Sequence, residues 1–253
     1  MSTLELEHLK HSSASGNNIT LAADGSVTVD TTTLKVDATN NRVGIGTASP
    51  SDALHVKGFT QVESTAGDAA YIRFNNTVNS GGKTWRAGAG VSSHGTFSIY
   101  NQSDNKFGIT VNSNGQVTKP NQPSFHAYRG SGQVISGQVV FQFTSTLHNI
   151  GGHYDTSTYQ FTAPVTGSYF FSFKSLLYSM NSAEYFDFYP QVNGVNRRRY
   201  EFTGNGGAHS QFDYSDVYYL NAGDTVRMTG TDRNTGSFSL YGNENHFSGF
   251  LLG

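Results

Sequence analysis

The stretch Gly167-Ser-Tyr-Phe-Phe-Ser-Phe173 decides the fold, because an aromatic residue stands at every second position from Tyr169 to Phe173. Successive side chains of a β-strand point to opposite faces of a sheet, so Tyr169, Phe171 and Phe173 share one face. Gly167 opens this strand after the turn Ala163-Pro-Val-Thr166. The pattern predicts a strand whose aromatic face is buried in a core or in an interface between subunits.

Similar runs of apolar and aromatic residues continue on both sides of this strand. None has the spacing of an amphipathic helix, and short turns separate them, which favours a β-sandwich or jelly roll. The clearest runs are Val139-Val-Phe-Gln-Phe143, Tyr185-Phe-Asp-Phe-Tyr189, Thr225-Val-Arg-Met228 and Phe247-Ser-Gly-Phe-Leu-Leu252.

An internal repeat marks the N-terminal half. Ile19-Thr-Leu-Ala-Ala-Asp-Gly-Ser-Val27 and Ile109-Thr-Val-Asn-Ser-Asn-Gly-Gln-Val117 share their spacing of apolar residues around a turn, and Leu34-Lys-Val-Asp-Ala-Thr-Asn-Asn-Arg-Val43 repeats it. Alternation on both sides of an Asp-Gly or Asn-Gly turn predicts short β-hairpins.

The first two of these hairpins carry too few aliphatic side chains to form a core in a monomer. Ordering the backbone costs about 1–2 kcal/mol per residue, which such limited burial does not offset. The same strands from three chains around one axis would share a core, so residues 18–60 are interpreted as an oligomeric shaft. A flexible linker rich in Gly, Ser and Thr is the alternative.

The chain is therefore predicted to be all-β, with a trimeric β-rich shaft and small knob followed by a C-terminal jelly-roll sandwich. Pro120 and Pro123 bracket a polar stretch that cannot continue the interior of a sheet. The predicted segments are an attachment segment at 1–17, the shaft at 18–60, a small β knob at 61–119 and the head at 120–253.

The composition excludes several classes of function. The chain has no cysteine, which removes disulfides, thiolate zinc sites and a cysteine nucleophile. A net charge of -2 provides no global attraction to nucleic acid. No apolar run approaches the length of a membrane span and no export signal is recognisable, so we expect neither membrane insertion nor export through the Sec pathway.

The C-terminal half resembles the globular head family of complement component 1q. The intervals that mark this family are occupied by Phe143, Asn149, Tyr154, Phe161, Gly167, Tyr169, Phe171 and Phe173. The segments 220–226 and 247–252 resemble its late turn and closing strand. The resemblance implies a ten-stranded jelly roll of the tumour-necrosis-factor type that packs as a trimer. We expect the core or trimer interface to include Phe143, Tyr154, Phe161, Tyr169, Phe171, Phe173, Phe247 and Phe250.

The N-terminal half resembles bacteriophage tail fibres instead. Asn41-Arg-Val-Gly-Ile-Gly-Thr-Ala-Ser-Pro-Ser-Asp-Ala-Leu-His-Val56 is similar to a segment that recurs in fibre and tailspike shafts. The chain has no Gly-X-Y repeat of the collagen stalk that precedes the animal domain. The two resemblances together imply a fibre on a phage virion, made in the host cytoplasm and exposed on the released particle.

No residue pattern indicates an enzyme. Asp213 and Asp216 are three apart and would lie on opposite faces of a strand, which argues against a glycosidase pair. No cofactor is expected, although some relatives of the jelly roll hold calcium through carboxylates. The candidate calcium ligands here are Asp187, Asp213 and Asp216, beside the loop 181–184.

The sharpest local feature is Arg197-Arg-Arg-Tyr200. If the arginines are exposed, three copies would form a basic collar suited to the phosphate or carboxylate groups of lipopolysaccharide or capsule. The alternative, that one or two of them pair with Glu201, Asp187 or Asp213, is equally compatible with the sequence. The candidate receptor-binding residues are Arg197, Arg198, Arg199, Tyr200, Asn205, His209, Asp232 and Arg233.

The main functional hypothesis is a homotrimeric, non-enzymatic adhesin. An N-terminal segment with Leu4, Leu6 and Leu9 would attach to a tail or capsid protein, and the head would bind a host polysaccharide or lipopolysaccharide. A purely structural capsid or tail fibre, with the head as trimerisation clamp, is the first alternative. A depolymerase that degrades host glycans is the second.

Overall fold

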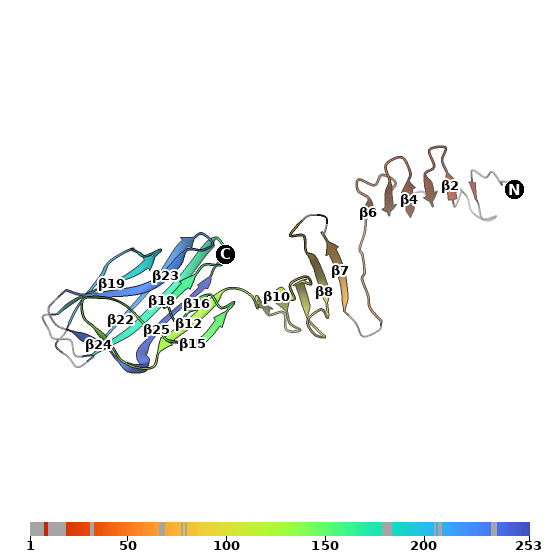
Figure 1. The fold of residues 1–253 in the computed structure, drawn as a ribbon. Coiled ribbons are helices and arrows are strands. Elements are labelled where there is room, and N and C mark those ends of the chain that lie inside the picture. Colours follow the sequence, from red (N-terminus) through yellow and green to blue (C-terminus); the bar gives the residue numbers. More distant parts are fainter. Residues whose placement is uncertain are drawn as a thin grey trace. The chain divides into compact units, whose positions relative to one another are not determined.

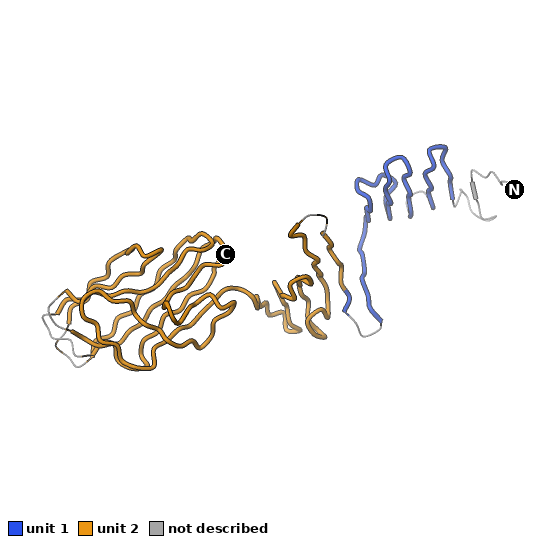
Figure 2. Tube along the Cα trace, in the orientation of Figure 1, with its two compact units in different colours: residues 1–70 blue, residues 71–253 orange. Residues whose placement is uncertain are grey.

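The computed structural model describes residues 8–9, 19–30, 33–65, 69–76, 78, 80–178, 184–204, 206, 209–233 and 237–253. The chain divides into two compact units, Met1–Ala70 and Tyr71–Gly253 (Figure 2). All regular elements of the described residues are strands except the single 3-10 turn η1 (Gly242–Glu244), which confirms the all-β prediction. The four predicted segments remain predictions.

The first unit contains a six-stranded sheet in the order β1-β2-β3-β4-β5-β6 (Figure 1). The predicted hairpins are confirmed, because β2 pairs with β3 and β4 with β5 in antiparallel fashion. Gly25 and Asn41 have positive φ in the two turns, as the Asp-Gly and Asn-Asn sequences require. The strands are His8–Leu9 (β1), Ile19–Leu21 (β2), Val27–Val29 (β3), Leu34–Asp37 (β4), Arg42–Ile45 (β5) and Leu54–Val56 (β6).

One face of this sheet is entirely aliphatic between β2 and β6. The strand register aligns two rows of side chains across the five strands, and the residues between them, such as Thr28 and Lys35, point to the other face. No Ile, Leu, Val or Ala side chain that the structure describes in this unit is buried. The rows are Ile19, Val29, Leu34, Ile45 and Val56, and Leu21, Val27, Val36, Val43 and Leu54.

The fibre-like segment 41–56 forms a parallel pair, which the hairpin pattern did not predict. β5 runs parallel to β6, and the loop between them folds back closely on the sheet. Gly44 and Gly46 make this return possible, because a Cβ atom on either would lie 2.6 Å from a backbone oxygen, of Thr47 and Lys57 respectively. Arg42 Nη1 donates to the Pro50 carbonyl at 3.0 Å and fixes the loop.

The second unit begins with a five-stranded sheet in the order β11-β10-β9-β8-β7. The third copy of the repeat is again a hairpin, since β10 pairs with β11 around Gly115. The strands are Ala70–Asn75 (β7), Thr84–Ala89 (β8), Phe97–Asn101 (β9), Lys106–Val111 (β10) and Val117–Thr118 (β11).

The rest of the unit is a sandwich of two seven-stranded sheets (Figure 1). We name them the long sheet and the short sheet. The long sheet contains Ser124–Arg129 (β12), Gln133–Ile135 (β13), Ser145–Ile150 (β15), Gly167–Tyr178 (β18), His209–Leu220 (β22), Phe238–Leu240 (β24) and Asn245–Leu251 (β25). The short sheet contains Gln138–Val140 (β14), Tyr154–Asp155 (β16), Gln160–Thr162 (β17), Tyr185–Val192 (β19), Val195–Asn196 (β20), Tyr200–Thr203 (β21) and Thr225–Asp232 (β23).

Aromatic rings from the two sheets fill the space between them. Tyr169, Phe171 and Phe173 of β18 are fully buried, as their alternation predicted. Phe173 stacks on Phe141 with ring centroids 5.2 Å apart, and Phe188 of the short sheet meets Phe212 of the long sheet at 4.2 Å. Among the described residues, no helix is long and apolar enough to cross a membrane.

Candidate binding surfaces of the head

The expected core residues lie in this sandwich with one exception. Phe143, Tyr154, Phe161 and Phe247 are buried together with the aromatics of β18. Asn149 explains part of the pattern, because its side-chain amide donates to the Tyr154 carbonyl at 2.8 Å and its oxygen accepts from the Tyr154 amide at 3.1 Å. These two bonds close the loop that leads Tyr154 into the core.

Phe250 is the exception, because it points away from the protomer core and is 42% exposed. It belongs to a row across the outer face of the long sheet, in which Val217, Phe170, Phe250, Ser124 and Ile150 are neighbours on successive strands. The rings of Phe170 and Phe250 are 5.3 Å apart. This row is an exposed apolar stripe. The expected contact of Phe250 with another protomer remains a prediction.

Three histidines from three adjacent strands cluster on the same face: His126 and His148 lie in the next row, and His246 lies one row further along. His126 Nε2 is 3.0 Å from His246 Nδ1, and the ring centroids of His126 and His148 are 6.3 Å apart. Burial and the two neighbouring imidazoles lower the pKa of His126. The sequence spacing of these histidines gave no signal, because only the strand register brings them together.

On the outer face of the short sheet, Arg199 and Arg233 form ion pairs. Arg199 Nη2 lies 3.2 Å from Glu201 Oε2 and its Nε 3.8 Å from Asp187 Oδ1. Arg233 contacts the same two carboxylates, with its Nη1 2.5 Å from Glu201 and its Nε 3.5 Å from Asp187. Two positive and two negative charges therefore compensate each other. Arg199 thus forms the ion pairs that the sequence allowed as the alternative to an exposed basic collar.

The arginine run itself lies between β20 and β21 and not within a strand, so strand alternation does not govern where its side chains point. Arg197 and Arg198 are exposed. Tyr200 stacks on Phe188 with centroids 5.2 Å apart and packs against the core, which indicates a structural role.

The other two described candidates come from different sheets, His209 from the long sheet and Asp232 from the short sheet. His209 starts β22 and lies 4.9 Å from the ring of Tyr241. Asp232 is buried at the end of β23, and Asn205 lies outside the described residues.

The three candidate calcium ligands also diverge. Asp187 lies under two arginines, Asp213 faces outward opposite Lys174, and Asp216 is on the other face of β22 beside Tyr218. The described residues contain no group of three His, Cys, Asp or Glu side chains arranged to hold a metal ion. These carboxylates do not fit a shared calcium site within one protomer.

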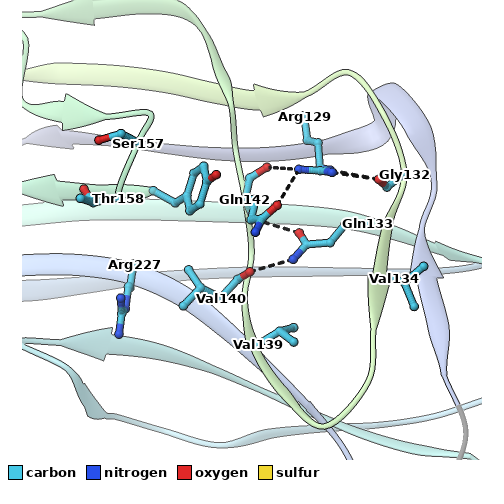
Figure 3. A pocket seen from close by; sticks show the side chains of 11 residues that line it. Arg129, Gly132, Gln133, Val134, Val139, Val140, Gln142, Ser157, Thr158 and Arg227 are labelled. Carbon is cyan, nitrogen blue, oxygen red and sulfur yellow. Dashed lines mark hydrogen bonds between the residues drawn. The ribbon is translucent and has the colours of Figure 1, made fainter.

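An open depression of about 690 Å³ lies where β14 and β17 both pair with β23 (Figure 3). Arg129 and Arg227 enter it from different sheets, and the hairpin loop 157–159 forms one side. Among the lining residues there is no carboxylate. No sequence pattern indicated this site, since its residues are distant along the chain. The lining residues are Arg129, Gly132, Gln133, Val134, Val139, Val140, Gln142, Ser157, Thr158, Tyr159 and Arg227.

Comparison with known proteins agrees with the predicted resemblance of the head. The C1q domain model matches residues 124–252, about half of the chain. Similar solved structures include the globular domain of the zebrafish complement 1qA protein, at 17% identity and a TM-score of 0.41, which covers 52% of this chain and 98% of that one. Murine APRIL at pH 8.5 matches at 12% identity and a TM-score of 0.40, covering 52% and 99%. Through its head, the chain belongs to the C1q domain family.

Proposed function

We propose that the protein is a homotrimeric fibre of a bacteriophage particle whose C1q head binds a host cell-surface glycan. It would attach to a tail or capsid protein through its N-terminal segment and be exposed on the released virion. No catalytic step is part of the proposal.

The aliphatic face of the β2–β6 strands carries this proposal. A sheet has to bury its apolar face against another layer, and none of the described residues of the first unit covers it. The face has no charged side chain in either of its rows, so identical copies can meet there without charge repulsion. Packing against the same face of other copies is the simplest way to bury it.

Two further observations support three copies and a phage context. The C1q family often forms trimers, and the head has an exposed apolar stripe on the long sheet, with Val217 48% and Phe250 42% exposed. The segment 41–56 resembles phage fibre shafts. Its Gly44 and Gly46 lie where the backbone leaves no room for a Cβ atom, which explains why glycine occupies these two positions. Three heads on one shaft would add avidity to weak single-site glycan binding.

A glycan array tests the adhesin part. The labelled full-length protein should bind at least one bacterial surface polysaccharide, and periodate oxidation of that polysaccharide should abolish binding. An intact trimer that binds no array feature would contradict the adhesin and favour the structural fibre. Release of reducing sugar ends from a bound polysaccharide would instead identify a depolymerase.

A further inference from the structure

The depression between β14 and β17 holds two guanidinium groups without carboxylate partners. Arg129 donates only to neutral oxygens, those of Gly132 at 3.0 Å and Gln142 at 3.1 Å. Arg227 Nε donates to Gln191 Oε1 at 2.8 Å. Neither forms an ion pair with a described residue. Their charges are therefore uncompensated, in contrast to those of Arg199 and Arg233.

Hydrogen bonds within the chain fix the walls of this depression. Gln133 Nε2 donates to the Val140 carbonyl at 2.8 Å, and its Oε1 accepts from the Gln142 amide at 3.0 Å (Figure 3). These bonds tie β13 to β14 and hold Gln142 beside Arg129. The site is thus organised before any ligand arrives, which lowers the entropic cost of binding.

The hairpin loop on the other side supplies hydroxyl groups and an aromatic ring. Asp155 Oδ1 accepts from the Ser157 amide at 2.7 Å and from its hydroxyl at 2.6 Å, which holds the loop in place. Tyr159 keeps a positive φ of 58°, a conformation that L-residues adopt rarely. Thr158 is exposed and Tyr159 partly exposed beside the arginines.

From this arrangement we propose that the depression binds an acidic saccharide. Its carboxylate or phosphate group would lie between Arg129 and Arg227, which suit planar and tetrahedral oxyanions. The sugar hydroxyls would bond to Gln142 and Thr158, and the sugar ring would pack on Tyr159. The inference rests on the proposed glycan-binding function and names the ligand class and its site.

Calorimetric titration of the full-length protein tests this site with oligogalacturonate as the probe. Fully methyl-esterified oligogalacturonate is the matched control, since it has the same backbone without the charge. A second arm uses glucose 6-phosphate against glucose, which distinguishes a phosphate from a carboxylate source. We expect binding of at least one charged probe and at least roughly tenfold weaker binding of its uncharged counterpart.

Arg227→Gln should weaken binding of the charged probe by roughly tenfold or more. Lys119→Gln removes an equal charge from the exposed segment directly before the head and should change affinity less than about twofold. Equal effects of the two substitutions would overturn the site, and failure of both charged probes to bind would overturn the ligand class. If either result is obtained but the protein binds a neutral glycan on the array, this site is overturned and the proposed adhesin function is not.

Discussion

The β1–β6 sheet and the jelly roll follow the same alternation of apolar and polar residues, but only the jelly roll buries its apolar side within one chain. In the head, two sheets face each other and aromatic rings from both pack together, with the ring centroids of Phe188 and Phe212 4.2 Å apart. In the first unit, a single layer presents its aliphatic rows without cover from the described residues. Alternation thus specifies a sheet, whereas a second layer decides whether that sheet is stable alone.

The largest expected effect comes from the core of the head. Phe171→Ala removes a ring that packs against Phe161 and Phe247, and it should lower the free energy of unfolding of the head by about 3–5 kcal/mol. Denaturant unfolding followed by circular dichroism measures this. Val195→Ala, on an exposed edge strand, should cost less than about 0.5 kcal/mol. A small loss for Phe171→Ala would show that the two-layer core is not what holds the head together.

The next effect concerns the aliphatic face of the first unit. Val29→Asp places a charge within one aliphatic row, so strands β2–β6 should lose protection from amide hydrogen exchange while the head keeps its own. Thr28→Asp places the same charge on the opposite face and serves as the matched control. Equal protection in both variants would mean that neither face is covered in the assembled protein.

A moderate effect is expected at the four-charge cluster of the short sheet. Asp187 is only 3% exposed, so Asp187→Asn leaves Arg199 and Arg233 to share Glu201 and should cost about 1–2 kcal/mol, reduced by the exposure of the arginines. Urea unfolding measures the change. Glu201→Gln should cost less, because Glu201 is 41% exposed. The reverse order of the two losses would contradict the role assigned to Asp187.

The smallest effect is a dependence of head stability on pH. The pKa of His126 is lowered in the folded state, so the unfolded chain binds a proton first as pH falls. The stability that neutral His126 contributes to the head is fully present above the unfolded pKa of about 6.5, and it is lost as pH falls through the folded pKa. His126→Gln should flatten this part of the curve of unfolding free energy of the head against pH. A curve unchanged by His126→Gln would contradict the assignment.

The sequence predicted features that depend on local periodicity. The aromatic strand at residues 167–173, the hairpins around Gly25 and Gly115 and the buried family residues follow from alternation, turn residues and fixed spacing. It could not predict features that depend on strand register. The cluster of His126, His148 and His246 and the depression lined by both Arg129 and Arg227 arise only when distant strands are placed side by side.

The proposed function requires three copies of the chain to assemble and cover the apolar faces. The most direct test is the molar mass of the full-length protein by light scattering over a wide range of concentrations. A trimer has three times the 27.4 kDa of one chain, and we expect no dissociation on dilution to low micromolar concentration. A mass of one chain at every concentration would contradict it.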